Sequence, residues 1–215
     1  MILRSHFFDF LNKLYIIYVV LKRNKYEVVL VLKTKDILDE KDKRLRSVSK
    51  EVKFPLTKKD KDLINTMITY LHDSQIPELA EKYDLRPGMG MSAIQLGVAK
   101  RIFVVVNEIG EPGEGEFETY ILINPKIVSN SMEKIYVEEG EGCLSVNRPV
   151  EGIVPRYARV TMEAYDTDGN KIQVRGREEL AVCFQHELDH LNGILFVDKI
   201  DKKNPYKGKD QMRAI

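Results

Sequence analysis

A stripe of apolar residues at helical spacing is the first clear pattern along the chain. After Thr57, apolar residues recur every three or four positions, as Leu63, Ile64, Met67, Ile68 and Leu71. This period predicts a helix with one face in the core, and Thr57 is a suitable N-cap for it. A short helix over 77–83 should follow, and the Pro-Gly loop at 86–88 should end it.

The period changes to that of β-strands from about residue 101. Three apolar runs favour strands: RIFVVV at 101–106, YILINPKIV at 120–128 and KIYVEE at 134–139. The glycine-rich segment 108–118 should be an exposed loop. Residues 159–174, RVTMEAYDTDGNKIQV, have the pattern of a hairpin, and the Asp168-Gly169 pair in its turn tolerates positive φ.

A last helix is predicted over 178–191, because Asn192-Gly193 is a suitable left-handed cap for its end. The predicted strands therefore lie between helices at the two ends of this region. Helices segregated from strands in this way indicate an α+β fold rather than an alternating α/β fold.

The first 33 residues form a separate segment that could hold a helix and then a strand at 27–32. Its apolar run LYIIYVVL at 14–21 resembles a signal region, but no small-residue cleavage site follows it. Eight apolar residues are far fewer than the roughly 20 that span a bilayer. We expect this segment to belong to a cytoplasmic protein and leave its role open.

Composition changes this picture little. The chain has 215 residues, 43% of them hydrophobic, and a formal net charge of +1, so a single sizeable core is expected. The balance of charge gives no reason to expect a nucleic acid or a membrane as the main partner. The two cysteines, Cys143 and Cys183, make no disulfide framework, and we expect reduced thiols.

The strongest chemical signal is QHELDH at 185–190. On a helix, His186 and His190 lie one turn apart on the same face, where they could hold one metal ion. Glu187 would lie beside them as a proton carrier. The alternative is a surface helix with two exposed histidines. The apolar run before His186 argues against a surface helix, because it indicates that this helix is buried. Burying two histidines and an acid without partners costs roughly several kcal/mol, and a bound metal would provide the partner.

A catalytic metal usually takes three protein ligands and keeps an open position. The other histidines, His6 and His72, lie in unpromising contexts, which leaves Cys143 in EEGEGCLS as the candidate. A small buried hydrophobe is the alternative role for this cysteine. The stretch GMGMSAIQLG at 88–97 places Gln95 among small residues, where its amide could donate to an oxyanion.

Together, GMGMSAIQ, EGCLS and QHELDH resemble the three signature motifs of the peptide deformylase family, in the family's order. The resemblance covers about 36–201, and the segment HDSQIPELAEKYDLRPG before the first motif resembles the Gram-positive-type branch. It implies antiparallel β-sheets packed around a central C-terminal helix that carries HExxH. It also implies a catalytic domain at 34–215, which removes the N-formyl group from the methionine of nascent polypeptides.

The resemblance implies a role for each matching residue. The metal ligands would be Cys143, His186 and His190, and Glu187 would be the general acid and base. Gln95 and the backbone N–H of Leu144 would stabilise the oxyanion. Gly90 would bind the substrate backbone, and Val182 and Cys183 would line the methionine pocket, although core packing explains these two equally well.

Family members use one Fe²⁺ per chain, with Zn²⁺, Ni²⁺ or Co²⁺ as substitutes, and a His₂Cys set suits zinc and iron alike. The resemblance implies formyl-methionyl nascent peptides as partners, with transient ribosome association. Glu141 would pair with Arg156 to hold the cysteine loop, the alternative being a solvated surface pair. Asp189 could orient a ligand. Ser92 stands where the family usually has alanine, a change that should leave the loop intact.

Two other functions fit parts of this pattern. A zinc endopeptidase shares HExxH but takes its third ligand, Glu or His, downstream, where only Asp198 and Asp201 are near. A structural metal module, or an inactive metal-binding relative, is the other alternative. A structural site needs four closed ligands, and it would leave Glu187 and Gln95 without a role.

Overall fold

The computed structural model of the chain describes residues 16–22, 25–109 and 116–215. The chain divides into two compact units, Met1–Leu32 and Lys33–Ile215. In the first unit, strand β1 (Ile16–Lys22) pairs antiparallel with β2 (Lys25–Val31). The strand expected at 27–32 therefore forms, and 16–22 is also strand. Any helix over 1–15 lies outside the described residues.

The second unit contains a five-stranded sheet in the order β3-β4-β5-β8-β9, in which every neighbouring pair is antiparallel. Its strands are β3 (Gly90–Ser92), β4 (Ile102–Ile109), β5 (Glu116–Asn130), β8 (Arg159–Tyr165) and β9 (Lys171–Arg177). A second sheet, β10-β6-β7, joins β6 (Lys134–Tyr136), β7 (Arg156–Tyr157) and β10 (Arg213–Ala214). The predicted hairpin is confirmed as β8 and β9.

Three α-helices complete this unit: α1 (Lys58–Gln75), α2 (Pro77–Tyr83) and α3 (Glu178–Leu191). The side chain of Thr57 caps α1, as its sequence predicted, by accepting a hydrogen bond from the N–H of Asp60. The α+β fold is therefore confirmed. In the described part of the chain, no helix is both long and apolar enough to cross a membrane.

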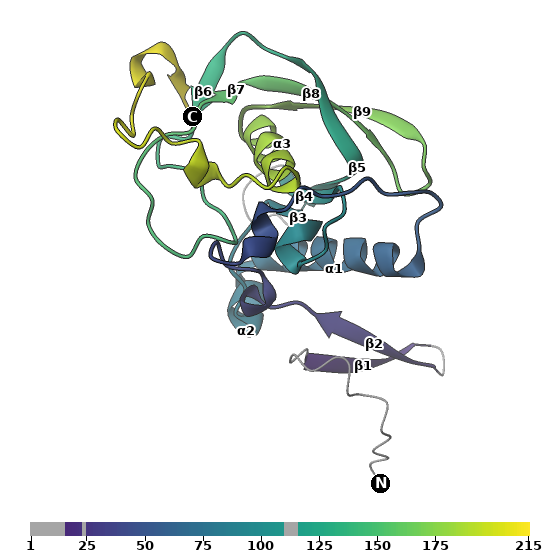
Figure 1. Cartoon of the computed structure of the whole chain (residues 1–215). Coiled ribbons are helices and arrows are strands. Elements are labelled where there is room, and N and C mark those ends of the chain that lie inside the picture. Colours follow the sequence, from purple (N-terminus) through teal and green to yellow (C-terminus); the bar gives the residue numbers. More distant parts are fainter. Residues whose placement is uncertain (1–15, 23–24, 110–115) are drawn as a thin grey trace. The chain divides into compact units, whose positions relative to one another are not determined.

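Strand β4 lies between two helices, which explains its continuous apolar sequence. Its first five residues, Ile102 to Val106, are completely buried, so both faces of the strand must be covered. Phe103 and Val105 belong to the core cluster that includes Phe184 of α3, and α1 also packs against β4. Figure 1 shows α3 enclosed between the sheet strands, with α1 on the other side.

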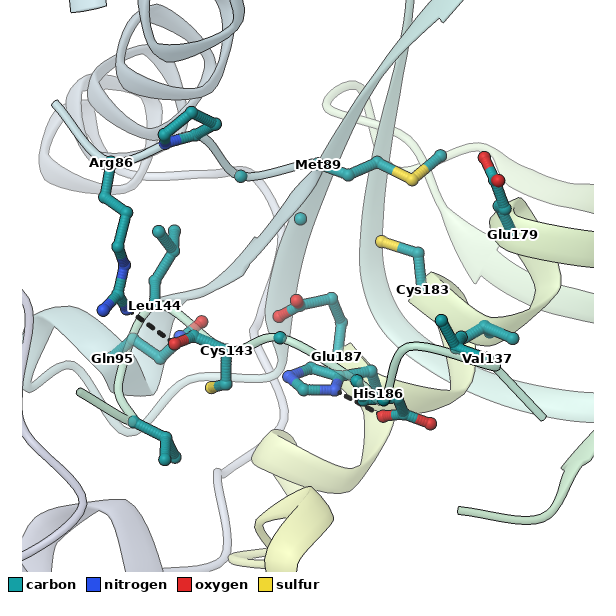
Figure 2. Close-up of a pocket in the computed structure, with 18 residues that line it drawn as sticks. Arg86, Met89, Gln95, Val137, Cys143, Leu144, Glu179, Cys183, His186 and Glu187 are labelled. Carbon is teal, nitrogen blue, oxygen red and sulfur yellow. Dashed lines mark hydrogen bonds and ion pairs between the residues drawn. The ribbon is translucent and has the colours of Figure 1, made fainter. Parts of the chain in front are cut away.

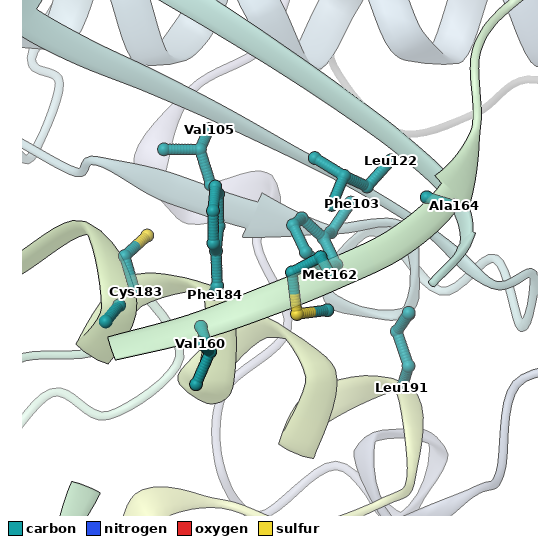
Figure 3. Packing of buried hydrophobic residues seen from close by; sticks show 10 residues of the cluster. Phe103, Val105, Leu122, Val160, Met162, Ala164, Cys183, Phe184 and Leu191 are labelled. Atoms are coloured by element: carbon teal, nitrogen blue, oxygen red, sulfur yellow. The ribbon is translucent and has the colours of Figure 1, made fainter. Parts of the chain in front are cut away.

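The core beside α3 is built from alternating residues of four strands. Figure 3 shows Phe103, Leu122 and Met162 gathered around Phe184. The ring centroid of Phe184 lies 6.1 Å from that of Phe103 and 5.5 Å from that of Tyr120, in an edge contact. This packing fixes one face of α3 rigidly, so the opposite face can present polar groups in defined positions.

Candidate metal centre

The polar residues of QHELDH lie on the second half of α3, which is largely buried. His186 is 8% exposed, Glu187 3% and His190 0%. The ring centroids of His186 and His190 lie 4.9 Å apart, as expected for residues one helical turn apart. The alternative of two solvent-exposed histidines is excluded, and the buried polar groups need partners to offset their desolvation.

The loop that carries Cys143 approaches α3 at the two histidines. The Sγ atom of Cys143 lies 3.3 Å from Nε2 of His190 and accepts a hydrogen bond of 3.4 Å from the N–H of Ser145. The potential ligand atoms of Cys143, His186 and His190 all lie within 4.8 Å of one another. One sulfur and two imidazole nitrogens at this spacing fit a tetrahedral zinc or iron site with an open position.

An ionised carboxylate orients His186. The pKa of Glu141 falls to about 2, because hydrogen bonds from Arg156 and His186 outweigh the opposing effect of burial. A carboxylate can only accept, so Nδ1 of His186, 3.0 Å from Oε2 of Glu141, carries the proton. The other nitrogen, Nε2, is then the one that can bind a metal.

Arg156 links this carboxylate to the end of α3. Its guanidinium donates two hydrogen bonds to Glu141, of 2.7 and 2.8 Å, and a third of 2.5 Å to Asp189. Lys199 lies 3.0 Å from the same Asp189 oxygen. The side chains of Arg156 and Glu141 are 1% and 3% exposed, so the pair is a buried clamp and not a solvated surface pair.

Among the described residues, one hydrogen-bond donor reaches the carboxylate of Glu187, at one of its two oxygens. The hydroxyl of Ser92 lies 2.7 Å from Oε2 and donates to it. Burial raises the pKa of Glu187, although His186 and Ser92 act in the opposite direction. A Cβ atom placed on Gly90 would lie 2.7 Å from Oε1, so this second oxygen faces the space above the Gly90 backbone.

Gln95 is held at both ends of its amide. Its Oε1 accepts a 2.8 Å hydrogen bond from the N–H of Ser92, and its Nε2 donates to the hydroxyl of Ser145 at 3.2 Å. An NH₂ group has a second hydrogen, which remains for a ligand. Within the described residues, the N–H of Leu144 donates to no backbone carbonyl. Two donors are therefore available near Cys143.

A cavity of about 440 Å³ joins these groups. Figure 2 shows Gln95, Cys143, Leu144, His186 and Glu187 around its inner part. Its remaining wall is largely apolar and is formed by Met89, Val137, Leu144, Val146, Val182 and Cys183. Gly90 also lines the cavity, so every candidate residue except His190 lies in its wall, and His190 meets Cys143 and His186 in the metal centre.

A further histidine, His72, lies away from the metal centre, and the contacts of Ser92 and Arg86 were not predicted from the sequence. His72 lies on α1, next to Asp73 and in an edge contact with Phe117, and His6 lies outside the described residues. The bonds of Ser92 to Gln95 and Glu187 were not expected from the sequence. Arg86 was also missed; its guanidinium donates a 2.6 Å hydrogen bond to the carbonyl of Cys143.

The chain matches the model of the family described as polypeptide deformylase over residues 34–206. It is 43% identical to peptide deformylase 2 of Bacillus cereus over 186 residues, which cover 86% of this chain and 99% of the relative. It is 46% identical over 171 residues to peptide deformylase 2 of Bacillus subtilis, covering 80% and 91%.

Solved structures of similar fold carry the same description. A peptide deformylase from Legionella pneumophila superposes with a TM-score of 0.60 at 33% identity, covering 78% of this chain and 86% of that one. The peptide deformylase from Ehrlichia chaffeensis in complex with actinonin gives a TM-score of 0.62 at 34% identity, with coverage of 80% and 90%.

Proposed function

This chain belongs to the polypeptide deformylase family, and from that premise we propose which of its residues carry out the reaction. Members of the family are metal-dependent hydrolases that remove the N-formyl group from the N-terminal methionine of new polypeptides. We assign the catalytic domain to 34–215. The observation that carries the assignment is the meeting of Cys143, His186 and His190, the first two of which line the cavity.

In this proposal, Cys143, His186 and His190 hold one Fe²⁺ per chain. Sulfur and imidazole donors suit iron and zinc alike, so Zn²⁺, Ni²⁺ and Co²⁺ are the expected substitutes. An ion held by these residues would supply hydroxide near neutral pH, by lowering the pKa of a water molecule. Because Nδ1 of His186 is hydrogen-bonded to Glu141, Nε2 is the nitrogen that would bind the ion.

The substrate backbone would lie along β3. This strand is at the edge of its sheet, since β4 is its one neighbour in the sheet order, and an extended peptide can pair with such an edge. Gly90 lines the cavity and its missing side chain leaves room for the peptide next to Glu187. The methionine side chain would then enter the apolar part of the cavity, against Val182 and Cys183.

Hydrolysis of the formyl amide needs a stabilised oxyanion and one proton transfer. The NH₂ group of Gln95 and the N–H of Leu144 would donate to the carbonyl oxygen as water adds to the formyl carbon. Glu187 would take a proton from the water and deliver it to the leaving nitrogen as the C–N bond breaks. The raised pKa of Glu187 suits both steps. Formate and a free amino terminus result.

The decisive experiment measures metal content and activity together. Protein purified without oxygen should contain one iron per chain, and it should release formate from formyl-Met-Ala-Ser. A chelator should abolish the activity and Fe²⁺, Ni²⁺ or Co²⁺ should restore it. Cys143→Ser should bind metal more weakly, because a hydroxyl is a poorer donor than a thiolate. If this variant keeps one tightly bound ion per chain, Cys143 is not a ligand.

The zinc endopeptidase alternative is tested by the same assay, because such an enzyme cleaves internal peptide bonds and releases no formate. We also propose a cytoplasmic location and transient association with the ribosome, since formylated amino termini arise there during translation. Co-sedimentation of the protein with translating ribosomes, lost when the nascent chains are released, would support this part of the proposal.

A further inference from the structure

One charged side chain of the cavity is paired with no other residue in the described part of the chain. Besides the thiols of Cys143 and Cys183, five titratable side chains line the cavity: Arg86, Glu141, Glu179, His186 and Glu187. Four of them form hydrogen bonds with other parts of the chain. Among the residues that the structure describes, Glu179 has no hydrogen-bond or ion-pair partner, whereas its neighbour Glu178 is paired with Arg213. Its carboxylate is therefore available to a ligand.

The helix places Glu179 at the outer end of the apolar wall. It precedes Val182 and Cys183 by three and four positions, so all three side chains share one face of α3. It precedes His186 by seven positions, which corresponds to about 10 Å along the helix axis. Figure 2 shows Glu179 beyond Cys183 and close to Met89, on the side of the cavity opposite Arg86.

The geometry of an extended peptide indicates which substrate residue would meet this carboxylate. In a strand, side chains alternate between the two faces, so residues 1 and 3 of the substrate point the same way, about 7 Å apart. The methionine at position 1 faces Val182 and Cys183 in the proposed function. The side chain of residue 3 then faces the same wall farther from the metal centre, toward Glu179.

We propose that Glu179 is a specificity-determining residue that favours formyl-methionyl chains with lysine or arginine at the third position. This inference rests on the proposed function and adds a charge preference to it. Arg86 would not attract an acidic third residue of the substrate, because it lies on the opposite side of the cavity from Glu179. Its guanidinium is also hydrogen-bonded to the Cys143 carbonyl and to Asn147. Glu179 is exposed, so the attraction is partly screened by solvent.

The test compares peptides that differ only in one charge. C-terminally amidated formyl-Met-Ala-Lys-Ala and formyl-Met-Ala-Glu-Ala are assayed with the metal-loaded full chain, and formyl-Met-Ala-Ala-Ala is the neutral reference. We expect kcat/KM to be about two- to fivefold higher for the lysine peptide, the range of an exposed ion pair. The difference should lie in KM, and 0.5 M salt should remove most of it.

Substitutions separate this carboxylate from the overall charge of the protein. Glu179→Gln should bring the lysine-to-glutamate ratio close to one, and Glu179→Lys should invert it. Glu81→Gln, which removes an exposed acid from α2 outside the cavity, should keep the wild-type ratio. The matched pair with the charge at position 2 should show a smaller ratio, since that side chain points to the other face.

Two results would overturn the inference. One is an unchanged lysine-to-glutamate ratio in Glu179→Gln, measured on enzyme that keeps its full metal content and still deformylates the neutral peptide. The other is an equal loss of the ratio in the Glu81 and Glu179 variants, which would assign the preference to net charge. Failure of the proposed function looks different, because formate would then be released from none of the peptides, the neutral one included.

Discussion

At the scale of single residues, the carboxylate of Glu187 accepts a hydrogen bond at one oxygen, and no described residue donates to the other. Ser92 binds Oε2 at 2.7 Å, and Oε1 faces the space above Gly90. A group oriented in this way can exchange a proton with a ligand while keeping its position. Because Glu187 belongs to the helix turn between the two histidines, its removal should affect chemistry more than metal binding.

We therefore predict that Glu187→Gln keeps one metal ion per chain and loses about 10²- to 10⁴-fold in kcat, the usual contribution of a general acid–base group. The glutamine oxygen can still accept from Ser92, so the fold should persist. Metal content and formate release are measured on the same preparation. Turnover near the wild-type value in the loaded variant would rule out Glu187 as the proton carrier.

Gly90 is required by the close approach of two side chains. A Cβ atom at this position would lie 2.7 Å from Sγ of Cys183 and 2.7 Å from Oε1 of Glu187. Both neighbours are buried in α3, so neither can move away freely. Gly90→Ala should lower the free energy of unfolding by about 1–3 kcal/mol through overpacking.

The matched control is Gly142→Ala, because a Cβ atom at Gly142 meets no heavy atom within 4 Å. Chemical denaturation of the two variants, followed by circular dichroism, gives the comparison. Equal stability of the two would mean that the cavity yields to a methyl group at Gly90.

Sequence patterns predicted the identity of the central residues better than their connections. His186 and Glu187 follow from helical spacing, and Cys143 from the family motif. The role of Ser92 could not be predicted, because its hydroxyl meets a carboxylate 95 positions later in the chain. A contact of that kind depends on how β3 packs against α3, which no local period records.

At the scale of elements, the N-terminus of α1 is stabilised by a buried acid. Asp60 accepts hydrogen bonds from the N–H and the hydroxyl of Thr57, of 3.1 and 2.7 Å, and forms an ion pair with Lys100. Burial opposes its ionisation, but these partners prevail and lower the pKa of Asp60 below 3.8. The ionised form is therefore the one that stabilises the folded protein.

A lowered pKa in the folded state makes this stabilisation depend on pH. It is fully present above the unfolded pKa, near 3.8, and is lost as the pH falls through the lower folded value. We predict that Asp60→Asn destabilises the protein by about 2 kcal/mol at pH 7, from lost capping and a lost charged hydrogen bond. Its stability should also fall less steeply than that of wild type below pH 3.8.

Asp62→Asn is the control for this prediction, since the Asp62 side chain is 58% exposed in its pair with Lys58. Denaturation at a series of pH values provides the measurement. A variant Asp60→Asn with the same stability as Asp62→Asn at pH 7 would contradict the capping argument.

The elements with strong periodic patterns were the ones that the sequence predicted. Helices α1, α2 and α3 and the β8–β9 hairpin form where spacing and caps placed them. The three-residue strand β3 was expected to be loop, because its glycines and small residues carry no alternation. Strand β10 pairs parallel with β6, from 78 positions earlier, and two residues leave no detectable period.

At the scale of the whole molecule, the two units differ in what they contain. All the residues of the metal centre, and the match to the family over 34–206, lie in the unit Lys33–Ile215. The other unit contains the β1–β2 hairpin. An isolated two-stranded hairpin is at best marginally stable in water, so this unit is not expected to provide a catalytic group.

We therefore predict that deletion of residues 1–31, which keeps the buried Leu32, leaves kcat, KM and metal content of the folded protein unchanged within about twofold. Solubility or thermal stability should fall, because the apolar hairpin sequence is best explained by burial against protein surface. The truncated and full-length chains are compared after size exclusion, at equal metal content. A folded, metal-loaded truncation without deformylase activity would show that the first unit takes part in catalysis.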